Sequence, residues 1–231
     1  MTAPQPLNRR SAELVGPLVG SVLVLLALVI IWVARVSQGR DLYVSELGAA
    51  GQPTARWFEG ALLLIVAGGS LIAYAARGIR SRLPILAIWA PAVSLWIGCG
   101  FFLVASQVTC TTGCPLPVGV SFTWQDLIHT VVAVLAFAAA CFGMLQVSFA
   151  AGHRSLARFS LGAAVAVAVI AGAGGILSLA RFQAEFGSRL ELAATTIALG
   201  WLLTLGLVTA LRPVSSTRIA PIALEAPLPV G

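Results

Sequence analysis

Residues 15–36 read VGPLVGSVLVLLALVIIWVARV, and this stretch decides what class of protein the chain is. It is almost uninterrupted in its apolar residues and carries one charge, Arg35. An α-helix needs about 20 such residues to cross the hydrocarbon core of a membrane. A cleaved signal peptide has a shorter apolar core followed by a small-residue cleavage site, so we expect this segment to be retained as a membrane-spanning helix.

The composition of the whole chain agrees with that interpretation. Of its 231 residues, 59% are hydrophobic and only 10% are charged, whereas soluble domains carry roughly 25% charged residues. Such a chain has too little polar surface for a soluble enzyme, a nucleic-acid-binding protein or a disordered protein. The pI near 10.1 reflects arginine in membrane-protein loops rather than a nucleic-acid partner.

Six stretches are long and apolar enough to span a membrane. The sequence therefore predicts an all-α, polytopic bundle of six transmembrane helices. The expected spans are 15–36, 57–76, 84–106, 125–150, 159–180 and 190–211.

The placement of arginine predicts the orientation of the bundle. With the N-terminus inside, nine of the 14 basic residues fall on the cytoplasmic side and five on the other side, as the positive-inside rule requires. Both termini are then cytoplasmic. We expect residues 1–14 and the proline-rich segment 212–231 to be disordered tails on a single membrane domain, 15–211.

Two cysteines stand close together in the third of the five predicted loops, in the sequence TCTTGCPLP. The predicted topology places this loop in an oxidising compartment, where three residues between Cys110 and Cys114 allow a disulfide across a small turn. A metal pair is the alternative, but this spacing is not that of the usual zinc sites. The sequence therefore predicts a disulfide.

Asp126 and His129 lie in WQDLIHT at the outer end of the fourth predicted span. Their spacing places both on one helical face, and ionisable residues at membrane depth are candidates for function. The pair can serve as an oriented general base or as two metal ligands. Equally, Asp126 can cap the helix while His129 is hydrogen-bonded inside the bundle. Both interpretations stay open, and no metal or other cofactor is predicted.

Three further charged residues are candidates at the outer face. Glu46 lies in a turn-rich segment of the first outer loop, where it can lie over the mouth of the bundle as a third catalytic candidate. Glu59 and Arg189 are candidate ligand-binding residues near the outer ends of the second and sixth spans. Arg189 can bind a lipid phosphate, or it can extend to the interface as many membrane arginines do.

Three motifs occur in a fixed order along the chain: SELG at 45–48, the cysteine–proline loop 110–115 that leads to a helix with His129 near its start, and Gly187 with Arg189 and Trp201 in the last helix. In this order and spacing they resemble the domain-of-unknown-function family 998, a group of small prokaryotic membrane proteins. Family members often have an acid in that loop, where this chain has Thr111, Thr112 and Gly113.

The resemblance covers roughly residues 15–211. It implies a six-helix, multi-pass protein of a prokaryotic plasma membrane, and it points to Glu46, His129 and Arg189. It implies no reaction and no substrate.

Three functions compete on this evidence. The first is a polar site at the extracytoplasmic mouth of the bundle that binds or processes a lipid headgroup or small molecule, with membrane lipids as partners. The second is an accessory subunit that binds a partner membrane protein through the small residues AGAGG of the fifth span. The third is a small transporter, which the scarcity of polar groups at mid-span disfavours. Whether the protein is an enzyme is left open.

Overall fold

The computed structural model describes residues 7–115, 122–152, 154–180 and 182–211. This part of the chain forms six α-helices and no β-strand, so the predicted all-α class is confirmed. The α-helices are α1 (Leu7–Ser37), α2 (Ala55–Ala75), α3 (Pro91–Gln107), α4 (Trp124–Ser148), α5 (Arg154–Leu179) and α6 (Ala184–Leu211). Three short 3-10 helices accompany them, namely η1 (Ser45–Gly48), η2 (Ala76–Gly78) and η3 (Pro84–Ala87).

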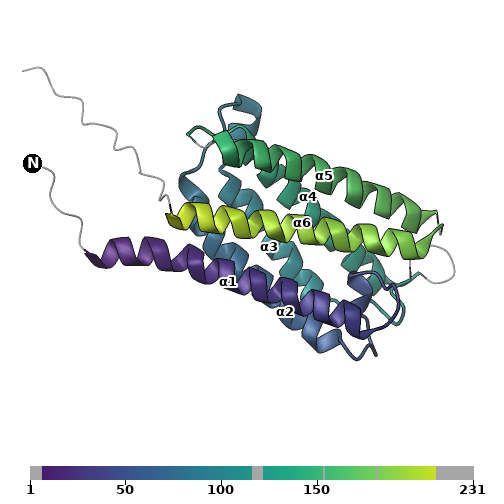
Figure 1. Ribbon diagram of the computed structural model, residues 1–231. Coiled ribbons are helices and arrows are strands. Elements are labelled where there is room, and N and C mark those ends of the chain that lie inside the picture. The colour runs from purple at the N-terminus through teal and green to yellow at the C-terminus, as the bar shows by residue number, and fades with distance from the viewer. Residues whose placement is uncertain (1–6, 116–121, 153, 181, 212–231) are drawn as a thin grey trace, which may run out of the picture.

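The helices pack as a ring in chain order. Each helix contacts its neighbours in the sequence, α6 closes the ring against α1, and α2 also touches α6. Figure 1 shows the helices running side by side, with the start of α1 and the end of α6 at the same end of the bundle. We call the opposite end, which carries the loops 38–54 and 108–115, the disulfide end.

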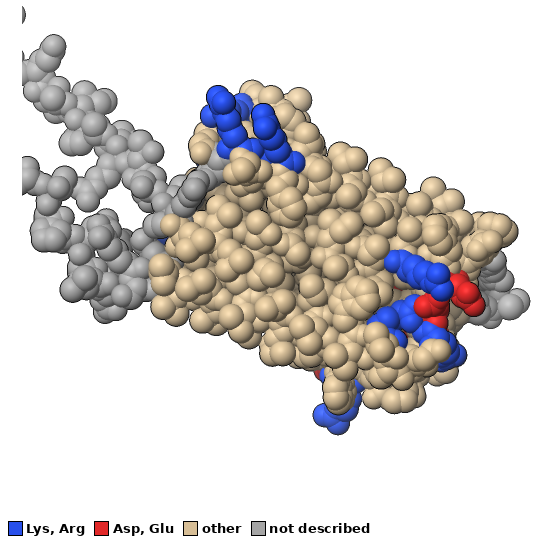
Figure 2. Space-filling model, viewed as in Figure 1, with Lys and Arg blue, Asp and Glu red and all other residues tan. Residues whose placement is uncertain are grey.

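Apolar side chains cover the outside of the bundle as well as its core. Five of the helices are long and apolar enough to cross a membrane, and outward-facing residues such as Val22, Val134 and Val169 are each more than 60% exposed. Figure 2 shows charged side chains gathered towards the two ends, with an uncharged band between them. The chain is therefore a multi-pass membrane protein.

The third predicted span, 84–106, is wrong at its start. α3 begins at Pro91 and has 17 residues, and a separate 3-10 helix precedes it. Ala90 has an extended backbone (ψ 150°), because the ring of a following proline disfavours the helical conformation. The fully buried amide of Gln146 then accepts a hydrogen bond from Ser94 and donates to two carbonyls of the segment before α3, at 3.0 and 2.9 Å.

The sixth helix is longer than predicted. It begins at Ala184 rather than at residue 190, so Arg189 and Glu191 lie one to two turns inside α6 instead of at its start. Glu191 is therefore an acid within a membrane helix, which makes it a candidate for a specific role.

The terminal segments can be compared with the prediction only in part. The helix α1 is described from Leu7, so it extends into the segment 1–14 that was expected to be disordered. Residues 1–6 and the expected tail 212–231 lie outside the described residues.

Glycine allows the first two helices to approach closely. A Cβ atom on Gly68 of α2 would lie 2.6 Å from the carbonyl oxygen of Gly20 on α1, and the reverse distance is 2.7 Å. Both contacts are with backbone, which cannot move aside without separating the helices. This is the small-residue packing typical of membrane helices, which gain little from burying apolar surface against each other in lipid.

Replacing Gly68 with alanine should therefore separate α1 from α2. We expect Gly68→Ala to lower the free energy of unfolding by about 1–3 kcal/mol through overpacking, measured by denaturant titration in detergent micelles. The matched control is Gly60→Ala in the same helix, where an added Cβ meets no atom within 4 Å. Equal stability of the two variants would contradict the close-approach argument.

Candidate functional site

The two loops of the disulfide end pack against each other. The backbone N–H of Ala50 donates to the carbonyl of Cys110 at 3.0 Å, and the hydroxyl of Thr112 donates to the carbonyl of Ala50 at 3.1 Å. The sulfur atoms of Cys110 and Cys114 lie at disulfide distance, the pairing that the sequence predicts. Gly113 and Cys114 both have positive φ, 79° and 45°, which shows how tightly the chain turns between the cysteines. Together the loops 38–54 and 108–115 cover this end of the bundle, and we call them the cap.

Asp126 holds this cap on α4. Its carboxylate is 1% exposed and accepts hydrogen bonds from the backbone N–H and the hydroxyl of Thr111, each at 2.8 Å, and from the hydroxyl of Thr123. Thr123 is the N-cap of α4, and its hydroxyl oxygen accepts from the N–H of Asp126 at 3.0 Å. Asp126 therefore connects the start of the helix to the disulfide loop.

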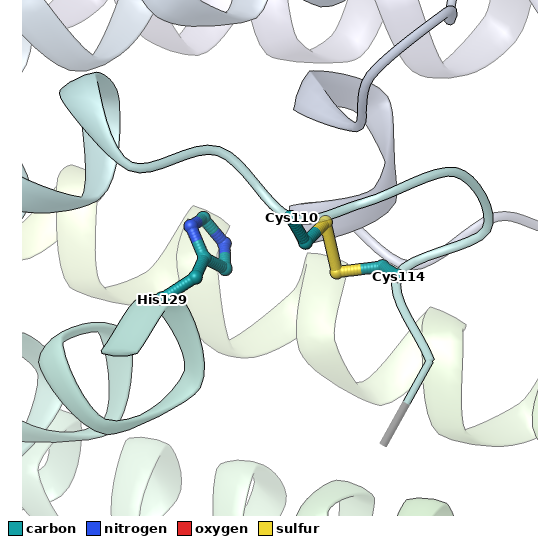
Figure 3. Close-up of side chains that lie close together, drawn as sticks. All are labelled: Cys110, Cys114 and His129. Carbon is teal, nitrogen blue, oxygen red and sulfur yellow. A yellow bond between two sulfur atoms is a disulfide. The ribbon is translucent and has the colours of Figure 1, made fainter. Parts of the chain in front are cut away.

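His129 lies one turn deeper and is 5% exposed. Its Nδ1 lies 2.7 Å from the carbonyl oxygen of Val108. Because a carbonyl can only accept, Nδ1 carries the proton. In the neutral ring the other nitrogen, Nε2, then bears a lone pair. Figure 3 shows the ring lying beside the disulfide, and the two sulfur atoms and a ring nitrogen of His129 lie within 4.8 Å of one another.

His129 also lines a cavity in the middle of the ring of helices. The cavity has a volume of about 90 Å³ and is bounded mainly by apolar side chains such as Ile65, Leu95 and Phe137. Apart from the thiol of Cys99, the ionisable groups that line it are His129 and Glu191. A space of this size holds a few water molecules, so it is far too small for a lipid.

Glu191 connects α6 to the first loop of the disulfide end. Its carboxylate accepts the backbone N–H of Val44 at 2.7 Å and that of Ser45 at 3.3 Å. These N–H groups stand at the start of η1, where a short helix leaves donors without backbone partners. The carboxylate therefore fixes the position of Ser45 and of Glu46, which follows it.

A groove runs between α1 and α6 on the outside of the bundle and has a volume of about 980 Å³. Asp41 lies at its disulfide end and binds two arginines: it accepts from Arg35 Nη2 at 2.6 Å and from Arg189 Nε at 2.8 Å. We call this space the α1/α6 groove; it is lined by Trp32, Arg35, Val36, Gly39, Arg40, Asp41, Glu185, Arg189, Leu192, Ala193, Thr196 and Ile197.

The two arginines lower the pKa of Asp41. The hydrogen bond from Arg189 is the largest cause, the one from Arg35 follows, and both favour the charged carboxylate. Arg35 is 7% exposed, whereas the side chain of Arg189 is 66% exposed. The Nε of Arg35 is buried and has no hydrogen-bond partner among the residues that the structure describes.

The candidate residues thus lie in three places rather than in one cluster. Asp126 and His129 lie beside the disulfide, Glu46 lies on η1, and Arg189 lies in the α1/α6 groove. Within the described chain, no hydrogen bond joins any of these four to another. Glu59 is partly buried in α2, and its carboxylate makes no hydrogen bond or ion pair with any residue that the structure describes.

The model of one protein family matches residues 18–208, and its description is "Protein of unknown function (DUF998)". The chain belongs to the DUF998 family. The resemblance found from the SELG, cysteine–proline and arginine–tryptophan motifs is therefore confirmed. Comparisons with curated proteins and with solved structures gave no significant match. Family membership supplies no reaction, so the function of this DUF998 protein must be argued from its geometry.

Three residues that matter in the structure were not candidates from the sequence. Glu191 was placed at a helix start and so was not recognised as an acid inside the bundle. Arg35 is the one charge of the first predicted span and Asp41 lies in the loop after it, and neither pattern by itself singled them out. The signal for the ion pairs was present, since Asp41 is the only acid between the end of the first span and Glu46 and stands among basic residues.

The anchoring of the first loop by Glu191 can be tested by replacing its carboxylate with an amide of nearly the same shape. In Glu191→Gln, one of the two carboxylate oxygens becomes an NH₂ group that cannot accept, so the N–H of either Val44 or Ser45 loses its acceptor. We expect the free energy of unfolding to fall by about 1–3 kcal/mol, because a buried donor loses its partner. Glu185→Gln is the control, since Glu185 is exposed at the start of the same helix. A loss of the same size in both variants would refute the anchoring role.

The ion pairs of Asp41 should make stability depend on pH. Because the folded-state pKa of Asp41 lies below its usual range, its charged form stabilises the protein above that range, and this contribution disappears as the pH falls through the lowered pKa. Thermal unfolding measured over a descending pH series should show an acid-side loss in the wild type that is reduced in Asp41→Asn. The loss should persist in Glu185→Gln; an unchanged profile in Asp41→Asn would contradict the assignment.

Proposed function

We propose that this protein binds a phosphate-bearing lipid headgroup at the disulfide end of the α1/α6 groove, with the acyl chains lying along the two helices. The observation that carries the proposal is the arrangement of the groove, which is charged at one end and mainly apolar along the rest, where Trp32 donates a hydrogen bond to Thr196 at 3.2 Å. Arg35, Arg40 and Arg189 meet Asp41 and Glu185 at the polar end. Val36, Leu192 and Ile197 contribute apolar surface.

The charges at the polar end suit a phosphodiester. Three arginines against two acids leave a net charge of one positive unit, which one phosphodiester neutralises. Asp41 binds Nε and Nη2 of Arg189, and the Nη1 of this exposed guanidinium makes no hydrogen bond within the described chain. Arginine binds phosphate oxygens with paired N–H donors, and Asp41 holds this one in a fixed orientation.

The size and the exposure of the groove also favour a lipid. Its volume of about 980 Å³ far exceeds the 90 Å³ of the central cavity. Val36 is 72% exposed and Trp32 is 42% exposed, so the groove is open at the side of the bundle. A lipid can therefore enter from the membrane without separating any helices.

The proposal includes a location and an orientation. The arginine distribution supports a position of the disulfide end outside the cytoplasm, and the resemblance to family 998 supports a prokaryotic plasma membrane. The ligand is then a lipid of the outer leaflet. The proposal is one of binding, and it assigns no reacting group.

An accessory role is a second candidate, and one feature of α5 favours it. Gly162, Gly172 and Gly175 have open space where a Cβ would stand, so they lie on the outer surface, whereas Gly174 packs against α6. Outward-facing glycines allow another membrane helix to approach closely. This role predicts a protein that copurifies with the chain and is lost when these glycines are replaced by leucine.

Lipid binding can be measured by native mass spectrometry of detergent-purified protein titrated with phosphatidylglycerol. We expect Arg40→Gln/Arg189→Gln to bind about 10- to 100-fold more weakly, the effect of losing charge-assisted hydrogen bonds. Arg158→Gln is the matched control, because Arg158 is exposed at the opposite end of the bundle. If the double variant retained wild-type affinity, the groove would not be the headgroup site.

A further inference from the structure

The disulfide lies beside a histidine that the proposed lipid site does not use. The sulfur atoms of Cys110 and Cys114 and one ring nitrogen of His129 lie within 4.8 Å of one another (Figure 3). Cys110 is 1% exposed and His129 is 5% exposed, whereas Cys114 is only partly buried. While the sulfurs are bonded to each other they are not thiolates, and only thiolates bind metal strongly.

The hydrogen bond of His129 prepares its free nitrogen to bind a metal. Nδ1 donates to the carbonyl of Val108 at 2.7 Å, and Nε2 makes no hydrogen bond within the described chain. Histidines that bind metals almost always donate their second N–H to a carbonyl or carboxylate, which fixes the tautomer and the direction of the ring. His129 has that arrangement.

Contacts other than the disulfide hold the cysteine loop in place. The backbone of Cys110 accepts from Ala50, and Thr111 donates twice to the buried carboxylate of Asp126. The N–H of Cys114 donates to the carbonyl of Thr111 at 2.8 Å. These bonds do not involve sulfur. When the disulfide opens, the two thiols therefore stay close to His129.

We propose that the reduced form of this loop binds one copper(I) ion through Cys110, Cys114 and His129. A dithiol reductant transfers two electrons and two protons to the disulfide and is itself oxidised to a disulfide. Copper(I) then displaces the two thiol protons and binds both thiolates and the Nε2 of His129. In this scheme Asp126 is a positioning residue, because it holds the loop and does not touch the metal.

The ligand set favours copper(I) over zinc. Two thiolates and one imidazole form a soft set of three, and copper(I) prefers soft sulfur ligands. Structural zinc almost always has four protein ligands. Among the described residues, no fourth histidine, cysteine or carboxylate ligand joins this cluster. This inference is independent of the α1/α6 groove, so each can fail alone.

The test uses the full chain in detergent, reduced with a phosphine, freed of reductant and titrated anaerobically with copper(I) against a coloured copper(I) chelator. We expect the reduced protein to take one copper(I) per chain from the chelator and the oxidised protein to take none. Cys110→Ser/Cys114→Ser should take none under either condition. Cys99→Ser/Cys141→Ser removes the two free thiols and should retain the single equivalent.

The role of His129 is tested by its glutamine variant and by spectroscopy of the wild type. We expect His129→Gln to bind copper(I) about tenfold or more weakly, as loss of a ligand or its support does. X-ray absorption of the wild-type complex should show two sulfur ligands and one nitrogen ligand, and this result does not depend on any variant folding.

Several outcomes would overturn the proposal. The first is failure of the reduced wild type to compete with the chelator for copper(I). The second is loss of copper(I) binding in Cys99→Ser/Cys141→Ser. The third is an X-ray absorption spectrum of the copper complex that shows sulfur ligands alone. Binding of one zinc(II) without competition for copper(I) would likewise overturn the assignment of the metal.

Discussion

The carboxylate of Glu191 is the contact on which the arrangement of the disulfide end depends. By accepting the N–H groups of Val44 and Ser45, it fixes the first loop to α6. That loop carries Asp41, which orients the arginines of the α1/α6 groove, and Ala50, which pairs with the disulfide loop. The hydrogen bonds of Glu191 therefore help to position both the groove and the cysteine–histidine cluster.

The free-energy cost of removing a carboxylate from water explains why Glu191 makes two hydrogen bonds. A carboxylate removed from water is stable inside a protein only when hydrogen bonds replace its hydration. Glu191 obtains them from backbone donors that would themselves lack partners at a short helix start. Asp126 solves the same problem with two threonines. In both cases one carboxylate accepts hydrogen bonds from backbone N–H groups of a loop, and these bonds fix the conformation of that loop.

Much of this architecture is predictable, because membrane spans follow from length and hydropathy. The six helices and the disulfide required only apolar stretches and a short cysteine spacing in a loop. The start of α3 was missed because apolar composition alone does not reveal the break at Pro91. Nor does it reveal that Gln146 binds the preceding carbonyls, which belong to residues 60 and 57 positions away. The charged candidates at the outer face were expected to form one site, but they lie apart. The position of a residue along a helix predicts its depth in the membrane, but not which other helix its side chain faces.

The short α3 has a consequence for the surrounding bilayer. At about 1.5 Å per residue, 17 residues span roughly 26 Å, which is less than the roughly 30 Å thickness of a typical hydrocarbon core. Trp96 and Ile97 on this helix are exposed at the side of the bundle, so lipid contacts it directly. Lipid chains beside α3 must shorten, or the helix must stand nearly upright, and each ångström of hydrophobic mismatch costs a fraction of a kcal/mol. That cost favours a thinner membrane on this one side of the protein.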